Sequence, residues 1–149
     1  MVYKNKTARM PAATARTRVL RPANDNVPEW RLQAAQVRAL RAMPEHGRLF
    51  LLAGDQNAAR RGPRAQVQAK ATGMTSGEPD LRIYLAQGRV AFIENKTAKG
   101  RLSPEQRDRH AAMARLGHVV EVVRAATEQE AAERAVTLVR TWLTTKQTA

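Results

Sequence analysis

The chain has 149 residues, with 26 Lys and Arg against 13 Asp and Glu, no Cys, and two each of Trp, Tyr and Phe. This length fits one domain, and the absence of cysteine excludes a disulfide scaffold, a thiol nucleophile and any cysteine-based zinc or iron–sulfur site. No apolar run reaches the length of a membrane span, and no apolar secretory segment follows the N-terminus. We therefore expect a soluble, cytoplasmic protein of bacterial or viral type, with no membrane partner.

The formal net charge of +13 is the first indication of a partner. Cationic surfaces attract polyanions because binding releases condensed counterions, so the charge favours nucleic acid. A membrane surface is less favoured, because the sequence contains no basic amphipathic helix with an aromatic apolar face. A basic protein without a polyanionic partner is the plain alternative, and charge alone indicates no activity.

Residues 1–26 differ in composition from the rest of the chain. They carry six Lys and Arg against one acid, Asp25, with Thr, Ala and Pro between them. We interpret this segment as a flexible basic arm that follows a phosphate backbone. A transit peptide and a solvated tail without a specific role are open alternatives. A short tail, residues 146–149, is expected at the other end.

The folded domain is expected to span residues 27–145. Its first helix begins near Pro28, where Trp30, Ala34, Val37 and Leu40 recur at roughly helical spacing, and it ends near residue 44. The segments that follow are predicted as a buried strand (48–53), a polar loop (54–63), a short helix (64–71) and an irregular stretch (73–79).

Three strands are predicted in the second half of the chain, at residues 81–85, 89–96 and 118–123. The first two are separated by Ala86-Gln87-Gly88, which is short enough for an antiparallel hairpin. Together with the helices around them, these strands predict an α/β fold with a mixed β-sheet flanked by helices.

Two helices in this half have clear start signals. Ser103 and Gln106 form a capping box, and the helix that they open is expected to end at Gly117. Thr127 and Glu130 form a second capping box, which opens a final helix to about residue 143.

The residues that indicate a chemical function lie on the two hairpin strands and directly before the first of them. Glu94 and Lys96 are two residues apart on a predicted strand, so both side chains leave the same face. Asp80 precedes the other strand, whose start lies beside the end of its partner and therefore near Glu94. Two converging carboxylates offer oxygen ligands to a hard cation such as Mg²⁺. A lysine ammonium at the same place can orient water and offset charge on a phosphoryl group.

Three short runs give this segment a family resemblance: Gly-Glu-Pro-Asp-Leu at 77–81, Phe-Ile-Glu-Asn-Lys at 92–96 and Gly-Arg-Leu-Ser-Pro-Glu-Gln at 100–106. With Leu-Gly-His-Val-Val at 116–120, they resemble the VRR-NUC family of the PD-(D/E)XK nuclease superfamily, over residues 29–132. The resemblance implies a restriction-endonuclease-like fold.

The resemblance also implies a magnesium-dependent DNA endonuclease, with Mn²⁺ as a substitute for Mg²⁺. In such an enzyme Asp80 and Glu94 bind the metal, and Lys96 assists the nucleophile. We expect a further metal ligand in the backbone carbonyl of Asn95. Members of the family that stand alone are associated with homodimers and with cutting branched DNA, including four-way junctions, so the resemblance implies DNA and a second copy of the chain as partners.

Two more residues are implied as catalytic. Gln106 matches the family's motif glutamine, and Glu29 matches an acidic position on the first helix of related nucleases. Each has a structural alternative, because Gln106 is also the capping-box partner of Ser103 and an acid at Glu29 suits a helix start. Asn95 departs from the family, which usually has an apolar residue there. We expect its side chain to face away from the site and to affect strand packing more than catalysis.

The spacing of these residues also permits plainer interpretations. Glu94 and Lys96 fit an exposed ion pair on one strand face, and Asp80 after a proline fits a turn. Five basic residues flank the expected cleft and are candidates for phosphate contacts, although each is also explained as a solvated charge: Arg60, Arg61, Lys70, Lys99 and Arg101. The three histidines are expected to pack or to face solvent: His46, His110 and His118. The two tryptophans, Trp30 and Trp142, are expected in the core rather than as surfaces on which bases stack.

Two other functions compete with the nuclease. The main alternative is a non-catalytic nucleic-acid-binding protein on the same fold, and another is an enzyme that acts on RNA or nucleotides. The joint presence of Asp80, Glu94 and Lys96 favours the nuclease, because a pure binder gains from removing carboxylates near phosphate. No base-reading module is evident, so we expect DNA shape to determine specificity.

Overall fold

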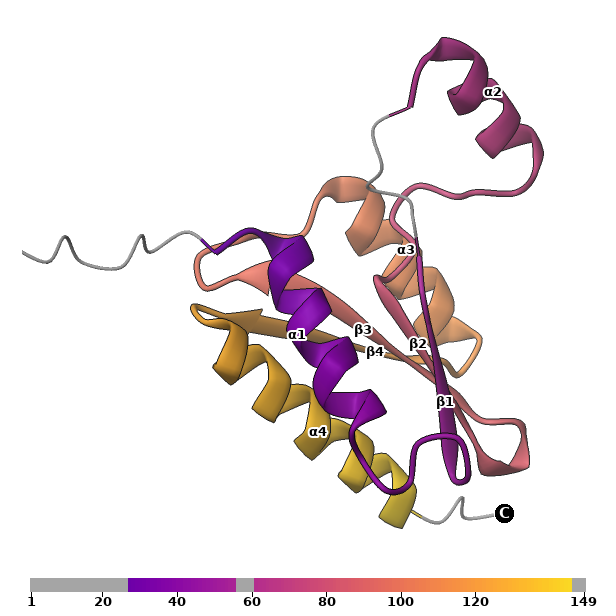
Figure 1. Cartoon of the computed structure of the whole chain (residues 1–149). Helices are drawn as coiled ribbons and strands as arrows, with labels where there is room; N and C mark the ends of the chain where they lie inside the picture. The colour runs from indigo at the N-terminus through magenta and orange to yellow at the C-terminus, as the bar shows by residue number, and fades with distance from the viewer. Residues whose placement is uncertain (1–26, 56–60, 146–149) are drawn as a thin grey trace, which may run out of the picture.

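A four-stranded mixed sheet forms the centre of the structure (Figure 1). The computed structural model describes residues 27–55 and 61–145. The strands are β1 (Phe50–Gly54), β2 (Leu81–Leu85), β3 (Val90–Thr97) and β4 (Val119–Ala125), and they lie in that order across the sheet. β1, β2 and β3 pair antiparallel, whereas β4 pairs parallel to β3, which confirms the predicted mixed sheet.

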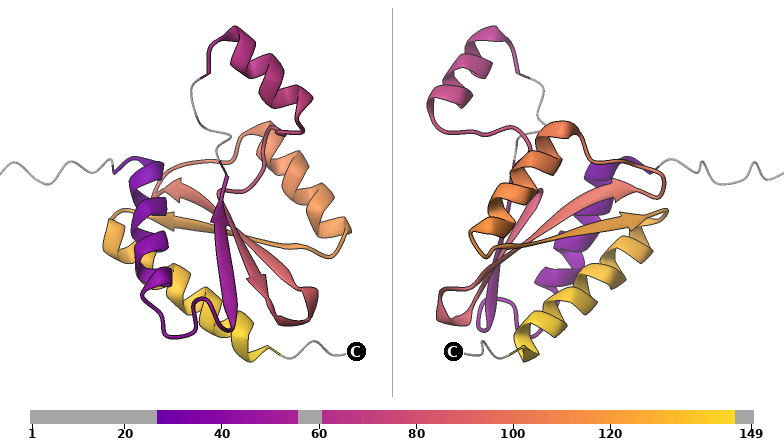
Figure 2. Two further views of the ribbon diagram at one scale, coloured as in Figure 1. Left: turned by 45° about the vertical axis from the view of Figure 1, so that its right-hand side comes forward. Right: turned by 180° about the vertical axis from the view of Figure 1, so that it is seen from behind.

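The helices flank both faces of this sheet, as predicted, with one exception. α1 (Glu29–Arg41) and α4 (Glu128–Thr144) lie side by side on one face, and α3 (Pro104–Arg115) lies on the other (Figure 1 and Figure 2). α2 (Pro63–Ala71) stands away from the sheet, and none of its residues is buried.

The main apolar core fills the space between the sheet and the α1–α4 pair. Its buried members are Leu40, Met43, Phe50, Leu81, Ile83, Ile93, Val123, Ala135 and Val139. Removing such side chains from water supplies most of the favourable free energy of folding. β3 has a neighbour on each side, and its residues 91–96 are all buried. The functional candidates on β3 are therefore carried by the most constrained strand of the sheet.

Local signals place the helix starts close to where the sequence predicts them. Ser103 Oγ accepts a hydrogen bond from the Gln106 N–H, and Gln106 Oε1 accepts one from the Ser103 N–H, so the first capping box is confirmed. Thr127 Oγ1 accepts from the Glu130 N–H, but the Glu130 carboxylate accepts from the Ala126 N–H instead of from Thr127. The second capping box is therefore only half formed.

Trp30 lies outside the core, contrary to the prediction from its spacing. It is 68% exposed, whereas α1 buries Leu32, Gln36 and Leu40. Because successive helical residues are rotated by about 100°, the face that buries Leu32 turns a residue two positions earlier toward solvent. Trp142 packs against the main core, as expected. His46 and His118 pack edge-on against aromatic rings, also as expected.

Some element boundaries differ from the predictions by a few residues. α1 ends at Arg41 rather than near residue 44, and β1 begins at Phe50 rather than at residue 48. β4 runs to Ala125, two residues further than expected, because it continues to pair with the end of β3. Gly117 follows the end of α3 with φ +85°, the conformation expected of a residue that terminates a helix.

Three predicted features lie outside the described residues: the basic arm at 1–26, the tail at 146–149, and Arg60. Within the part of the chain that is described, no helix is long and apolar enough to cross a membrane.

Candidate active site

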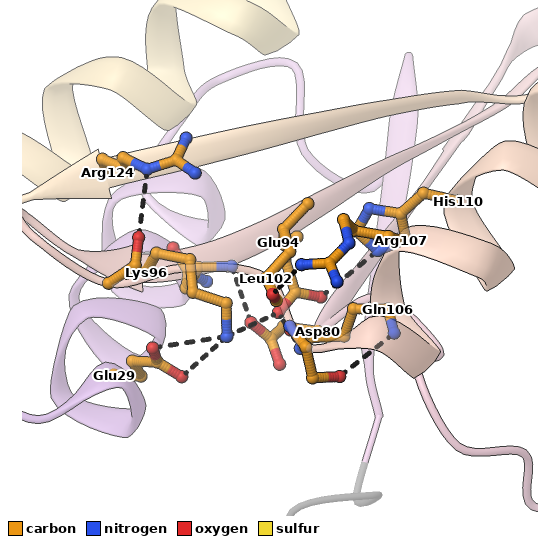
Figure 3. Close-up of polar contacts among 12 residues, drawn as sticks. Glu29, Asp80, Glu94, Lys96, Leu102, Gln106, Arg107, His110 and Arg124 are labelled. Carbon is orange, nitrogen blue, oxygen red and sulfur yellow. Dashed lines mark hydrogen bonds and ion pairs between the residues drawn. The ribbon is translucent and has the colours of Figure 1, made fainter.

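The end of the β2–β3 ladder brings two carboxylates together (Figure 3). The chain enters β2 through Pro79, which is buried and has no N–H to donate to the ladder. Asp80 follows it, and its Oδ2 accepts a hydrogen bond of 2.7 Å from the backbone N–H of Asn95. Asp80 and Glu94 consequently line the same cavity, which is the convergence that the hairpin geometry predicted.

Glu94 and Lys96 project from the same face of β3, and both are buried. Lys96 Nζ lies 3.3 Å from Glu94 Oε1, and the two side chains are 8% and 1% exposed. The alternative of an exposed ion pair is therefore wrong. Removing these charges from water is costly unless other groups compensate them, so their surroundings determine their protonation.

A third carboxylate reaches Lys96 from α1. The two oxygens of Glu29 lie 3.4 and 3.3 Å from Lys96 Nζ, while 43% of the Glu29 side chain remains exposed. Glu29 is also the first residue of α1, where a negative charge complements the helix macrodipole. Its position thus agrees with a helix-start acid and also puts it in contact with the site.

Gln106 on α3 contacts Glu94. Its Nε2 donates a hydrogen bond of 2.5 Å to Glu94 Oε1, while its own Oε1 accepts the capping-box bond from Ser103. One turn later, His110 Nε2 lies 3.7 Å from Glu94 Oε2. Both side chains therefore face the same carboxylate.

His110 corrects the prediction that the histidines only pack or face solvent. It is the site residue that sequence reasoning missed, although a signal for it existed. It follows Gln106 by four residues, and residues four apart lie on the same face of a helix. A helix that presents Gln106 to the site therefore presents His110 to it as well.

Burial and crowding disfavour the charged forms of these groups. Burial, and then the charge of Asp80, raises the pKa of Glu94 from its ordinary 4.5 to about 7. Burial also raises the pKa of Asp80, although the Asn95 N–H opposes this shift. Burial and the charge of Lys96 lower the pKa of His110, which favours its neutral imidazole. The site therefore holds more acid than one lysine neutralises.

The carboxylates line an open cavity of about 380 Å³ between the loop before β2 and the first turn of α3. Gly77, with φ +82°, approaches α3 so closely that an added Cβ would stand 2.5 Å from the Glu105 carbonyl oxygen. Only glycine fits at this point. An ion pair of 2.7 Å between Glu78 and Arg109 joins the same two segments. The loop that carries Asp80 is thus held directly against α3.

The donor set fits a hard divalent cation. Glu94 Oε2 is buried and accepts no hydrogen bond from any described residue. Asp80 and Glu29 add carboxylate oxygens to the cavity, and oxygen is the ligand that Mg²⁺ prefers. Among the described residues, no three Asp, Glu or His side chains form a metal cluster by themselves. A cation here would therefore need backbone, water or substrate oxygens as further ligands.

The side chain of Asn95 faces away from the cavity, as predicted. It is fully buried, and its Nδ2 donates a hydrogen bond of 2.9 Å to Gln36 Oε1 on α1. The polar side chain therefore has a partner where the sequence indicated a packing problem.

The predicted DNA-binding cations form two groups. Arg61 and Lys70 line a cavity of about 570 Å³ beside α2, and this cavity shares Ser76 with the carboxylate cavity. Lys99 and Arg101 are exposed in the loop that joins β3 to α3. The first group thus lines a cavity next to the carboxylate cavity, and the second lies in the loop that follows the strand of Glu94 and Lys96.

A cavity lined by carboxylates, a buried lysine in contact with two of them and basic residues on the neighbouring cavity define a site suited to a polyanionic substrate. Residues 52–127 match the family model of the VRR-NUC domain, and the chain therefore belongs to the VRR-NUC family. VRR-NUC domains are nuclease domains, so a nuclease function on nucleic acid is indicated, with DNA as the implied substrate. The family typically uses divalent metals.

The matched range contains Asp80, Glu94, Lys96 and Gln106, but it does not include Glu29. A solved structure described as a VRR_NUC domain also matches, with 21% sequence identity over 75% of this chain and 94% of that chain and a TM-score of 0.48. No curated protein matches the chain.

Proposed function

We propose that the protein is a metal-dependent DNA endonuclease that hydrolyses phosphodiester bonds. The observation that carries this proposal is the cluster of Asp80, Glu94 and Lys96, in which Glu94 and Lys96 are buried and Asp80 lines the same cavity as Glu94. Burying Glu94 beside a second carboxylate costs free energy, and a purely structural role does not explain that cost. A bound divalent cation would offset it, and a proton on Glu94 offsets it when no cation is bound.

Asp80 and Glu94 would hold Mg²⁺, or Mn²⁺ in its place, together with the backbone carbonyl of Asn95. In an antiparallel ladder a residue directs its N–H and its C=O toward the same neighbouring strand. The Asn95 N–H meets Asp80, so we expect its carbonyl on that side too. The bound ion supplies Lewis acidity, which lowers the pKa of water and offsets charge on the scissile phosphate.

Lys96 is the residue that we assign to the attacking water. Its ammonium has three N–H donors, and the carboxylates of Glu94 and Glu29 face it. A remaining donor can orient the water toward phosphorus and neutralise charge that develops on the phosphate oxygens. The water oxygen forms the new bond to phosphorus, the bond to the leaving oxygen breaks, and that oxygen gains the proton that the water loses.

Gln106 and Glu29 support these groups rather than the reacting atoms. Gln106 donates to Glu94 Oε1 and so orients the carboxylate, whose Oε2 faces His110 Nε2 at 3.7 Å. Glu29 contacts Lys96 from α1, whereas Glu94 contacts it from β3. The contact with Glu29 limits the positions that the ammonium takes up. Both therefore act as positioning residues in this proposal.

We further propose that the substrate is branched DNA, such as a four-way junction, and that the active form is a homodimer. Basic residues on the α2 side and in the loop after β3 would contact phosphates, which carry no base sequence. One site cuts one strand at a time. Two-fold symmetry is the simplest way to cut two strands of a symmetric junction.

The test is cleavage of linear, nicked and four-way DNA in Mg²⁺, in Mn²⁺ and in chelator, by the parent protein and by Asp80→Ala. We expect cleavage by the parent only with metal, and loss of cleavage in the variant with salt-sensitive DNA binding retained. Asp108→Ala, which removes an exposed carboxylate from α3, is the matched control and should cut like the parent. DNA binding without cleavage by the parent under every condition would favour the non-catalytic binder.

A further inference from the structure

We propose that Gln36 is a positioning residue, which holds the β3 peptide at Asn95 in the orientation that the site requires. The proposal rests on the proposed nuclease function only where it concerns metal binding. Its structural part concerns a buried polar connection that runs from α4 through α1 to β3.

The connection consists of three buried groups. Gln36 Nε2 donates a hydrogen bond of 3.4 Å to the Ala131 carbonyl of α4, and Gln36 Oε1 accepts one of 2.9 Å from Asn95 Nδ2. Both side chains are fully buried. A helix face that packs in a core normally carries apolar residues, and the other buried members of α1 are Leu32, Ala35 and Leu40. Gln36 is therefore a polar residue in a place that favours an apolar one.

Asn95 links this connection to the site through its own backbone. Its side chain lies on the α1 side of the sheet, while its N–H donates to Asp80 Oδ2 at 2.7 Å. Rotation of the residue about its strand axis would move both groups together. By holding the side chain, Gln36 holds the N–H that orients Asp80.

The side chains of Gln36 and Asn95 depend on each other for hydrogen bonding. Asn95 Oδ1 is buried and accepts no hydrogen bond from a described residue, while Asn95 Nδ2 donates to Gln36 Oε1. Removing either side chain leaves the other as a buried amide without its hydrogen bond, which is more costly than replacing both by apolar groups. The two positions should therefore tolerate a joint change better than either single change.

The experiment compares Asn95→Val, Gln36→Leu and the double variant with the parent. Gln129→Leu, an exposed glutamine on α4, is the matched control for introducing leucine into a helix. Two quantities are measured at 20 °C, where a melting curve shows each variant to be folded. They are the exchange rate of the backbone amide at position 95, by NMR, and the Mn²⁺ affinity, by calorimetry without DNA.

We expect each single variant to exchange the amide at position 95 roughly tenfold faster, since the hydrogen bond to Asp80 opens more often. Mn²⁺ affinity should fall several-fold in both single variants. The double variant should return both quantities to within about twofold of the parent, because two apolar partners restore a satisfied core. The control should match the parent throughout.

The proposal is overturned if the single variants exchange that amide at the parent rate, or if the double variant is no better than the worse single variant. Normal Mn²⁺ affinity in single variants with fast exchange would also overturn it, because a less constrained peptide at Asn95 would then have no effect on metal binding. If the parent itself binds no Mn²⁺, the proposed metal function fails, while the exchange rates still decide whether Gln36 holds the peptide.

Discussion

Two clusters of charge connect α1 to other elements, and they differ in burial and in charge balance. At one, Arg31 and Arg38 contact Glu128 of α4 at 2.6 and 3.4 Å, with the arginine side chains 53% and 68% exposed. At the other, Glu29 contacts Lys96, which is 8% exposed and also contacts a buried glutamate of β3. The first cluster has two cations for one acid, whereas the second has one cation for several acids.

Distance does not separate these clusters by function, because the shortest ion pair in the two, 2.6 Å, belongs to the exposed one. Water and salt screen exposed ion pairs, which therefore contribute little to stability and are easily lost. A buried cluster with excess acid needs compensation from a proton or a cation. Burial and charge balance, rather than proximity, identify the cluster that we expect to carry the chemistry.

The largest expected effect comes from removing the cation of the buried cluster. Lys96→Met keeps the length of the side chain but removes its charge, so developing charge on the phosphate loses a donor. We expect the cleavage rate at saturating metal to fall by roughly 10²–10³-fold. Arg38→Met makes the same kind of change in the exposed cluster and should leave the rate within about twofold. Equal effects of the two changes would remove the distinction between the clusters.

An intermediate effect is expected in the pH dependence of stability. Folding raises the pKa of Glu94 from 4.5 to about 7, because burial and Asp80 disfavour its charge. The folded state therefore holds this proton more tightly, and the stability that it contributes is complete below about pH 4.5 and is lost as pH rises through 7. In chelator, we expect Tm to fall by several degrees more between pH 5 and 8 in the parent than in Glu94→Gln.

Adding Mg²⁺ sharpens this measurement. A ligand that binds only the folded state raises Tm, so Mg²⁺ at pH 8 should recover the stability that the parent loses and should do less for Glu94→Gln. The pKa of Glu130 shifts in the opposite direction, because the Ala126 N–H lowers it. Its contribution is present above about pH 4.5 and is lost in acid. Parallel pH profiles for the parent and Glu94→Gln would contradict the assignment.

The smallest expected effect is the loss of the exposed cluster. Glu128→Gln removes two exposed ion pairs and should lower the free energy of unfolding by less than about 1 kcal/mol. The difference from the parent should shrink further in 1 M salt, where the Debye length is about 3 Å. Denaturant melts at two salt concentrations measure it. A loss of several kcal/mol would show that the exposed cluster is structurally essential.

The convergence of Asp80 and Glu94 could be predicted because it follows from local rules. Strand periodicity puts Glu94 and Lys96 on one face, and a short hairpin connection puts the start of one strand beside the end of the next. The capping box at Ser103 is equally local, since it depends on residues three apart. These features need no knowledge of how distant elements pack.

The errors concern features that depend on packing between distant elements. The orientation of α1 against the sheet buries Leu32 and exposes Trp30, and the spacing of apolar residues did not settle which face is buried. The contact between Gln36 and Asn95 joins residues 59 positions apart. His110 reaches Glu94 only because α3 packs on the side of β3 that carries the acid. Tertiary context decided each of these outcomes.

The pairing of Gly54 with Leu81 has a consequence for how this molecule can diversify. The chain leaves the sheet after β1 and returns beside it at β2, so the segment between Gly54 and Leu81 is an insertion between two paired strands. Loop-closure entropy rises only slowly with length, so such an insertion can be lengthened, trimmed or exchanged at small cost to the scaffold. α2 belongs to this segment (Figure 1). Asp80 directly precedes Leu81, where the chain re-enters the sheet. The surface that α2 presents to a partner can thus change in evolution while the strands that carry Asp80, Glu94 and Lys96 keep their positions.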